Sequence, residues 1–374
     1  MPETNQQTSI LIKNFTIMKK IFTLCAAFLA TLATFAQQQL ATLNHNDTIT
    51  AYYGATALQQ AHATAVNGDV ITLSSGTFSA VDITKLITIR GNGMEEDTIA
   101  GTKPTIISGD FLVTIPTSSV NQLKIDGVRI PNGFQCNEMS NAQITRCYMA
   151  GFSRHFTSSY CKNTQFVNCI IHSVYLADTY QAGYNGNRTE NNQFINCVIF
   201  QLGGSDLRDS SGNPLVHNCQ LINCIAKVEN WHLAYSYQNI PAYSCTNCIL
   251  YDDVHNESWF STLNNTAYCN NCIGININSA VDTFFFNSNH SNHNFSAMES
   301  VFKYYNGTYS EGMSFELDDS IATTFLGTDG TEIGIYGGMV PFNPRVSPRF
   351  VRCLVAPHTT LDGKLSVDIE VVSE

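Results

Sequence analysis

The sequence F-V-N-C-I-I at residues 166–171 returns as F-I-N-C-V-I at 194–199 and as L-I-N-C-I-A at 221–226. Three further copies, shorter or more divergent, extend the pattern in both directions along the chain. A period of this size indicates a repeat architecture. The six copies share cysteines that lie 22 to 28 residues apart: Cys147, Cys169, Cys197, Cys224, Cys248 and Cys272.

Each copy has the pattern of a short β-strand rather than that of a helix. Apolar and β-branched residues alternate with polar ones, and Asn, Gly and Ser cluster at the ends, as turns require. The leucines of a leucine-rich repeat are missing, and so is the 3.6-residue periodicity of a helical repeat. A winding of two or three short strands fits the period, so we predict an all-β, right-handed parallel β-helix.

Stacked windings place equivalent residues above one another. Asn tolerates the left-handed turn conformation, so we expect the asparagines of the phrase to form a column in which each amide hydrogen-bonds the next. The cysteines that follow them are expected to stack inside as small apolar side chains. The predicted asparagine column comprises Asn168, Asn196, Asn223, Asn247 and Asn271.

The N-terminal residues have the pattern of an export signal. Lys19 and Lys20 precede an apolar run at residues 21–35, and Ala36 supplies a small residue for cleavage. The run is shorter than the roughly 20 apolar residues that a membrane-spanning helix needs. We therefore predict that the signal begins at Met18 and that residues 1–36 are absent from the mature chain. The mature protein would lie at the cell surface, in the periplasm or outside the cell.

The charge balance excludes one class of partner. The chain has 374 residues, of which 13% are charged and 44% hydrophobic, and its net charge is −11. Removal of residues 1–36 leaves 16 basic and 29 acidic residues. Nucleic-acid binding requires clustered Lys and Arg, so we exclude a nucleic-acid partner. No segment after the leader is apolar enough to span a membrane.

Twelve cysteines remain after the leader, and three interpretations of them stay open. The pairs Cys245/Cys248 and Cys269/Cys272 form a C-x2-C…C-x2-C pattern, which is typical of zinc sites. Export would also permit disulfides among Cys219, Cys245 and Cys269. In the third interpretation all of them are inert buried thiols, because the second cysteine of each pair is the repeat cysteine.

The segment before the repeats also carries a fold signal. Residues 55–65 are expected to form a helix that covers the open end of the solenoid, where strand edges would otherwise be exposed. The phrases G-D-V-I-T-L-S-S-G-T-F from Gly68 and I-T-I-R-G from Ile87 follow it. This arrangement resembles the opening winding of the pectin-lyase-like superfamily, whose right-handed β-helices include polysaccharide lyases and many surface proteins. The resemblance spans roughly residues 50–280 and implies a fold more than an activity.

The repeat pattern decays after residue 280. We expect residues 37–280 to form the β-helix, and 281–374 to hold the last partial windings, loops and a C-terminal strand cap. The phrase G-T-E-I-G-I-Y-G-G from Gly330 resembles the closing phrase of exported β-helix proteins of Bacteroidetes-type bacteria. Residues 364–372 alternate in polarity and are expected to form an edge strand, either on the β-helix or in a small cap.

Two windings are longer than the others, with extra residues at 172–192 and 201–218. Extra residues in a solenoid form loops on one face, which is often the binding face. Aromatic rings that stack on sugars, beside carboxylates that accept hydrogen bonds from hydroxyls, suit a carbohydrate groove. Alternatively, the tyrosines cover the stack and the charges solvate the loops. The residues that we assign to the groove are Tyr175, Tyr180, Tyr184, Asp206, Asp209, Trp231 and Trp259.

A polysaccharide lyase would need a base, a cation that neutralises the uronate carboxylate, and an acid for the leaving oxygen. The candidate catalytic residues are Arg188, Arg208, His232 and Tyr235, and four aspartates are candidate Ca²⁺ ligands: Asp206, Asp209, Asp252 and Asp253. The adjacent pair Asp252-Asp253 is similar to the paired aspartates of polygalacturonases. The companion phrases G-H-G and R-I-K of that family are absent, so we exclude that activity.

These observations favour a non-catalytic, monomeric exported protein that binds a polysaccharide or a glycan on a host or cell surface. We expect it to have no resident cofactor or metal. The alternative is a polysaccharide lyase that acts by β-elimination on uronate-containing glycans, in which case Ca²⁺ would be its cofactor.

Overall fold

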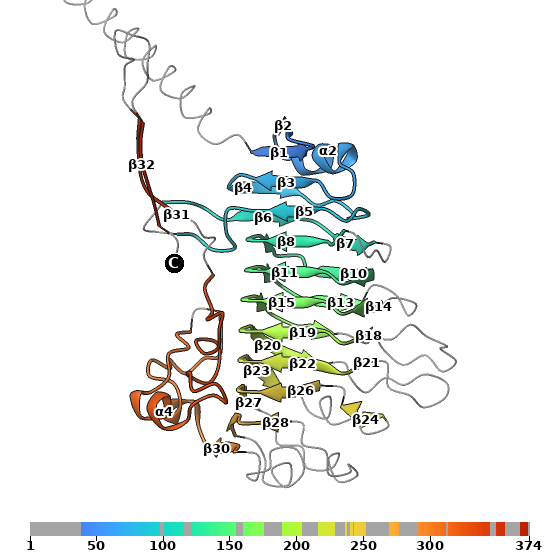
Figure 1. Cartoon of the computed structure of the whole chain (residues 1–374). Coiled ribbons are helices and arrows are strands. Elements are labelled where there is room, and N and C mark those ends of the chain that lie inside the picture. The colour runs from blue at the N-terminus through green and yellow to red at the C-terminus, as the bar shows by residue number, and fades with distance from the viewer. Residues whose placement is uncertain are drawn as a thin grey trace, which may run out of the picture.

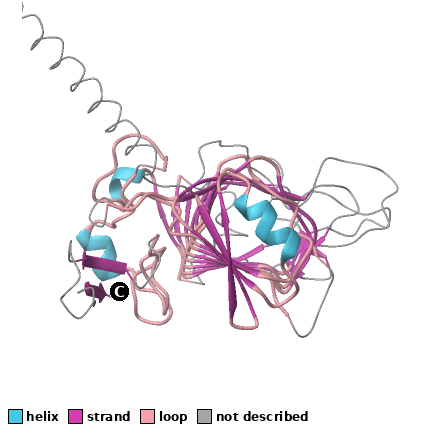
Figure 2. Cartoon of the chain, turned by 90° about the horizontal axis from the view of Figure 1, so that it is seen from above, coloured by secondary structure: helices cyan, strands magenta, loops and turns pink. Residues whose placement is uncertain are grey.

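The computed structural model shows a tall stack of short parallel strands, which is a parallel β-helix (Figure 1). Viewed down the stack, the strands of successive windings lie over one another (Figure 2). The predicted fold class is thereby confirmed. The described residues are 39–97, 101–115, 121–154, 160–175, 189–203, 216–228, 236–237, 240–241, 243–251, 269–276, 291–311, 313–344, 349–355 and 367–372.

One wall of the stack is an 11-stranded sheet, which we call the first sheet. Its strands are parallel except at the N-terminal end, where β1 pairs antiparallel with both of its neighbours. In spatial order the strands are β2 (Thr48–Tyr53), β1 (Leu40–His45), β3 (Val70–Leu73), β5 (Thr88–Arg90), β8 (Lys124–Asp126), β11 (Gln143–Thr145), β15 (Gln165–Val167), β19 (Gln193–Ile195), β22 (Cys219–Ile222), β26 (Tyr243–Thr246) and β28 (Cys269–Asn270).

The remaining walls belong to a 17-stranded second sheet. Ten of its strands form the wall that follows the repeat corner. From the N-terminal end they are β4 (Gly76–Ser79), β6 (Thr105–Ser108), β9 (Arg129–Ile130), β12 (Tyr148–Met149), β16 (Ile170–Ile171), β20 (Val198–Gly203), β23 (Ile225–Val228), β27 (Ile249–Tyr251), β29 (Ile273–Ile275) and β30 (His293–Phe295). The other seven are β7 (Phe111–Thr114), β10 (Phe134–Ser140), β13 (Phe152–Arg154), β14 (Tyr160–Lys162), β17 (Val174–Tyr175), β18 (Thr189–Glu190) and β21 (Val216–His217).

The elements outside these two sheets are few. The helices are α2 (Ala57–Thr64), α4 (Asp319–Thr324) and a 3₁₀ turn, η2 (Met298–Ser300). Two antiparallel pairs stand apart: β24 (Ser236–Tyr237) with β25 (Ile240–Pro241), and β31 (Arg349–Val355) with β32 (Val367–Val372). The predicted C-terminal strand is β32, and its partner is β31 rather than a strand of the β-helix.

The predicted capping helix is present as α2, within the expected residues. It lies across the N-terminal end of the stack (Figure 2) and buries Leu58 and Ala61 completely. The antiparallel hairpin β1–β2 lies beside it and begins the first sheet, a feature that the repeat pattern does not contain.

Each copy of the repeat phrase turns one corner of the β-helix. The five predicted asparagines all adopt the left-handed conformation, with φ between 49 and 54°. The strands before them align phrase on phrase, so that Phe166 lies opposite Phe194 and Phe194 opposite Leu221. The predicted asparagine column is therefore confirmed.

The hydrogen bonds of this column differ from the prediction. Only one amide-to-amide bond is found along it within the described residues, from Asn271 Nδ2 to Asn247 Oδ1 at 3.0 Å. Asn196 Nδ2 instead donates to the carbonyl oxygens of Ile335 and Gly337, each at 2.7 Å, and Asn168 Nδ2 donates to the carbonyl oxygen of Pro341 at 3.3 Å. The reason is that a later segment, residues 298–311 and 313–344, runs along the corner; we call it the strap.

Replacing Asn196 with Ala should destabilise the protein by about 3 kcal/mol. The substitution removes both 2.7 Å bonds, leaves the Gly337 carbonyl oxygen without this donor, and places Ala in a left-handed conformation, whereas the Ile335 carbonyl oxygen keeps the Phe342 N–H as a donor. Urea unfolding measures the loss. Asn141→Ala is the matched control, because Asn141 is also left-handed but partly exposed, and its side chain has no hydrogen bond to a described residue, so its cost of about 1 kcal/mol isolates the backbone contribution. Equal losses in the two variants would contradict the role of Asn196 in holding the strap.

A second asparagine ladder, which the sequence analysis missed, lies at another corner. Asn191 Nδ2 donates to Asn163 Oδ1 at 3.1 Å, and Asn218 Nδ2 donates to Asn191 Oδ1 at 2.5 Å. All three residues are left-handed and exposed. Here no strap covers the corner, and the amides bind one another as the prediction expected of the first column.

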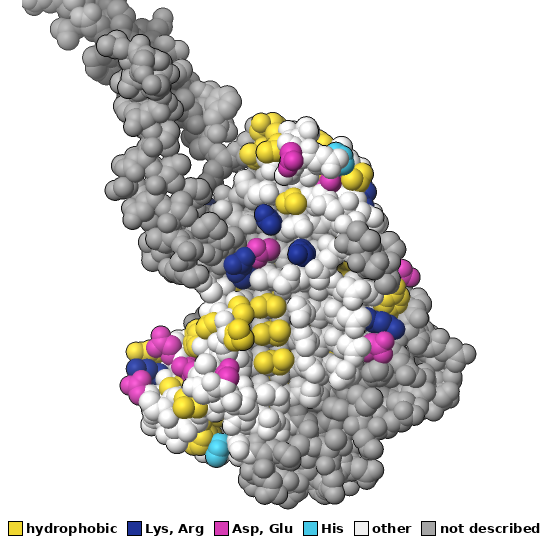
Figure 3. All heavy atoms as spheres, viewed as in Figure 1, with side chains coloured by type: hydrophobic (Ala, Val, Ile, Leu, Met, Phe, Trp, Pro, Cys, Tyr) yellow, Lys and Arg dark blue, Asp and Glu magenta, His cyan; other side chains and the backbone are white. Residues whose placement is uncertain are grey.

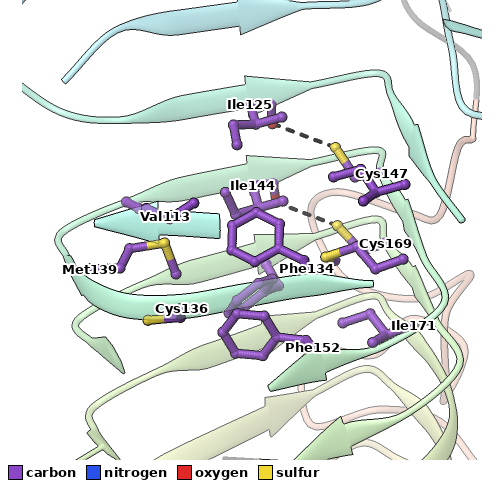
Figure 4. Packing of buried hydrophobic residues seen from close by; sticks show 14 of the residues in the cluster. Val113, Ile125, Phe134, Cys136, Met139, Ile144, Cys147, Phe152, Cys169 and Ile171 are labelled. Carbon is purple, nitrogen blue, oxygen red and sulfur yellow. Dashed lines mark hydrogen bonds between the residues drawn. The ribbon is translucent and has the colours of Figure 1, made fainter. Parts of the chain in front are cut away.

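The interior is a continuous apolar column (Figure 4). Phenylalanine rings stack through it, with centroids 5.4 Å apart between Phe134 and Phe152, 4.7 Å between Phe152 and Phe166, and 4.8 Å between Phe166 and Phe194. The repeat cysteines line one side of it, and Cys169 Sγ donates to the carbonyl oxygen of Ile144 at 3.5 Å. All eleven cysteines with described side chains are buried thiols.

A second apolar cluster lies outside the β-helix, between its wall and the strap. In each N-C-I-I phrase the first residue after the cysteine points outward, whereas the next points into the core: Ile170 belongs to the outer cluster and Ile171 to the interior. The strap covers the outer column with its own apolar residues, among them Phe302, Leu317 and Ile335. The outward column consists of Tyr148, Ile170, Val198, Ile225, Ile249 and Ile273.

Candidate functional site

The described strands that precede the predicted site residues in the chain end at successive levels of the second sheet. Tyr175 lies opposite Gly203 at the ends of β17 and β20, and Lys227 lies opposite Tyr251 on β23 and β27. The ends of these strands are therefore stacked along one edge. Tyr175 belongs to β17 by its backbone. The other predicted residues lie outside the described part of the chain: Tyr180, Tyr184, Arg188, Asp206, Arg208, Asp209, Trp231, His232, Tyr235, Asp252, Asp253 and Trp259.

The outward face of the first sheet is a surface built wholly from described strands. Side chains alternate across a strand, so residues two apart share this face. The in-register pairing arranges them in two columns that run along the stack. One is a glutamine column, Gln143, Gln165, Gln193 and Gln220; the other consists of Thr145, Val167, Ile195 and Ile222.

The glutamine column is a continuous hydrogen-bonded ladder through three windings. Gln165 Nε2 donates to Gln193 Oε1 at 2.8 Å, and Gln193 Nε2 donates to Gln220 Oε1 at 2.9 Å. Each amide has two donor hydrogens and two acceptor lone pairs, so the ladder leaves hydrogen-bonding capacity for a ligand. The ladder holds these amides in one orientation, one winding apart.

Basic side chains gather at the N-terminal end of the same face, and hydrophobic ones lie below them (Figure 3). Arg90 and Lys124 are exposed. Arg146 is paired with Asp126, with Nε–Oδ1 at 2.9 Å and Nη2–Oδ2 at 2.5 Å. This end of the face thus has three basic residues and one acidic residue, although the net charge of the whole chain is −11. This end of the face therefore favours negatively charged groups.

The face combines three features that suit a long sugar chain. The apolar column offers contact to the hydrophobic faces of sugar rings, and the glutamine ladder offers donors and acceptors to their hydroxyls. The basic end offers ion pairs to carboxylates. The sequence analysis missed this surface, although a signal was present: each glutamine of the column stands three residues before the corner residue of its phrase.

A half-open hollow of about 510 Å³ lies where the strap meets the first windings. Its central feature is Arg129, whose Nη1 and Nη2 lie 2.8 and 3.3 Å from the two carboxylate oxygens of Glu311 on the strap. The guanidinium also lies over the Tyr148 ring, 3.6 Å from its centroid. The lining residues are Met94, Glu95, Glu96, Pro104, Ile106, Arg129 and Glu311.

The electrostatics of this hollow do not suit elimination chemistry. Arg129 is held by both oxygens of Glu311, so it is committed to that carboxylate rather than to a uronate. Desolvation, reinforced by Glu311, raises the pKa of Tyr148, which keeps the phenol protonated near neutral pH and unfit as a base. Desolvation and the charge of Glu311 also raise the pKa of Glu95, although that residue is exposed at the rim. The Arg129–Glu311 pair therefore clamps the strap to the β-helix.

Two further findings concern the described residues alone. They include no group of three or more His, Cys, Asp or Glu side chains arranged to hold a metal ion. Among the helices in the described ranges, none has the length and apolar character needed to cross a membrane.

No family model, no curated protein and no solved structure matches this chain.

Proposed function

We propose that this protein is exported and binds carbohydrate, without catalysis, on the outward face of the first sheet. The observation that carries the proposal is the ladder Gln165–Gln193–Gln220, which stands beside the apolar column Val167–Ile195–Ile222. The export pattern before residue 37 supports a location at the cell surface, in the periplasm or outside the cell, where polysaccharides are available. The phrases at 57–93 support membership of the pectin-lyase-like superfamily, and those at 330–338 support a Bacteroidetes-type source.

The physical basis is that the repeat distance of the β-helix matches the repeat distance of a sugar chain. Neighbouring windings are about 4.8 Å apart, which is close to the length of one pyranose ring in a linear glycan. A sugar chain that lies along the stack therefore meets an equivalent amide and an equivalent aliphatic side chain at each winding. Because the backbone holds these groups in register, few side chains need to be ordered when the ligand binds.

The test is calorimetric titration of the mature protein with soluble oligosaccharides from neutral glucans, alginate and pectate. Gln193→Ala should weaken binding roughly tenfold, because it removes the central amide of the ladder and about 1.4 kcal/mol of hydrogen bonding. Gln60→Ala is the matched control, since Gln60 is an exposed glutamine on α2, away from the face. Equal effects of the two substitutions, or no binding to any of these glycans, would contradict the proposal.

The same samples test the lyase alternative. β-Elimination creates unsaturated chain ends that absorb ultraviolet light, so an enzyme would produce rising absorbance with alginate or pectate when Ca²⁺ is present. We expect no rise. A rise in absorbance would reject the non-catalytic function. The residues that follow Tyr175 and Gly203 in the chain would then be the first candidates for catalysis.

A further inference from the structure

The last windings of the β-helix bring four thiols together. Cys245 and Cys269 lie directly opposite each other on β26 and β28, and their exposed fractions are 1% and 0%. Cys248 and Cys272 follow the asparagine corner in the same two windings and are also fully buried. The C-x2-C…C-x2-C pattern of the sequence therefore places four buried thiols in two neighbouring windings.

The four thiols affect one another's pKa. Cys245 interacts with Cys248 and Cys269, and Cys272 interacts with the same two residues. The corner thiols are also tied to the backbone: Cys248 Sγ donates to the carbonyl oxygens of Leu221 and Thr246 at 3.3 and 3.2 Å. In the described structure, neither Cys245 Sγ nor Cys269 Sγ donates to a backbone carbonyl oxygen.

Other strand cysteines are kept apart. Cys136 Sγ donates to the carbonyl oxygen of Tyr160 at 3.1 Å. Between Cys161 and Cys219 stands the buried Asn192, whose Oδ1 is 3.5 Å from Cys161 Sγ and whose Nδ2 is 3.9 Å from Cys219 Sγ. No such side chain stands between Cys245 and Cys269 in the described structure, because the two residues are direct partners on neighbouring strands.

We propose that Cys245 and Cys269 form a disulfide when the exported chain folds in an oxidising compartment, and that this bond joins the last two windings. Neighbouring strands are about 4.8 Å apart, within the roughly 4.4–6.8 Å between Cα atoms that disulfides span. The oxidant is a disulfide, either glutathione disulfide or an oxidoreductase. The Cys269 thiolate attacks one of its sulfurs and releases a first thiolate. The Cys245 thiolate then attacks Cys269 Sγ and releases the second, so two electrons pass to the oxidant and two protons to solvent.

Both cysteines are buried in the folded protein, so an oxidant has no access to them there. The bond must therefore form before the last windings close, and once formed it is shielded from reductants.

The experiment folds the mature chain with reduced and oxidised glutathione and protein disulfide isomerase, and compares it with a chain folded under reductant. After unfolding and alkylation, mass spectrometry should count ten reactive thiols in the first sample and all twelve in the second. Peptide mapping should find Cys245 linked to Cys269. The reduced protein, once folded, should keep twelve thiols when it is moved to the same glutathione mixture.

Two variants test whether the disulfide joins Cys245 to Cys269. Cys269→Ser should abolish the link, whereas the matched core substitution Cys169→Ser should leave it in place. The oxidised wild type should also melt several degrees above the reduced one. Twelve reactive thiols after oxidative folding, or a link at other positions, would overturn the proposal, and the mapping of the wild type decides this even if a variant fails to fold.

Discussion

Replacing Ile225 with Asp should destabilise the protein by about 4 kcal/mol, because the carboxylate would be buried between the β-helix and the strap. Ile225 is 1% exposed and points out of the β-helix, into the apolar cluster that the strap covers. Gly334 of the strap packs between Ile249 and Ile225: a β-carbon at Gly334 would lie 2.9 Å from Ile249 Cδ1 and 3.7 Å from Ile225 Cγ1. Chemical denaturation monitored by circular dichroism measures the loss.

Ile222→Asp is the matched control for this prediction. Ile222 lies three residues earlier in the same winding and also points outward, but onto the open face of the first sheet, where it is partly exposed. The same change there should cost within about 1 kcal/mol. Similar losses at both positions would mean that the strap does not cover the outer column in solution.

Replacing Phe166 with Ala should destabilise the protein by about 3–5 kcal/mol. The Phe166 ring lies between those of Phe152 and Phe194, at centroid distances of 4.7 and 4.8 Å, and is completely buried. Its removal leaves a cavity in the middle of the stack, where no chain end can move in to fill it. Urea unfolding gives the change in midpoint at constant slope.

Val167→Ala is the control for Phe166→Ala. Val167 is the next residue along β15 and points to the opposite, partly exposed face, so its truncation should cost about 1 kcal/mol or less. A loss at Phe166 no larger than that at Val167 would show that the ring column is not the core of these windings.

The sequence predicted those parts of the fold that depend on local residues and on their repetition. The corner at Asn168 follows from the left-handed preference of Asn, and the inward position of Cys169 follows from alternation after that corner. The capping helix was predicted from the residues that form it. The candidate site was less accessible to sequence reasoning. The predicted loop residues lie outside the described part of the chain, and the glutamine ladder forms only when three windings are stacked.

The chain by itself determined the winding, its corners and which side chains enter the core, because these depend on φ preferences and on a two-residue period within each copy of the phrase. Only the tertiary structure decided what covers the outer column. Ile170 and Ile171 are both apolar and point to opposite faces of the strand, so both faces must be buried. No neighbouring residue in the sequence identifies the segment that buries the outer face. The strap that supplies it is more than 120 residues away in the chain, and the amide of Asn196 meets Ile335 only after the β-helix has formed. A contact between residues so far apart in the sequence depends on the complementarity of two surfaces that exist only in the folded protein. A local sequence pattern does not predict such a contact.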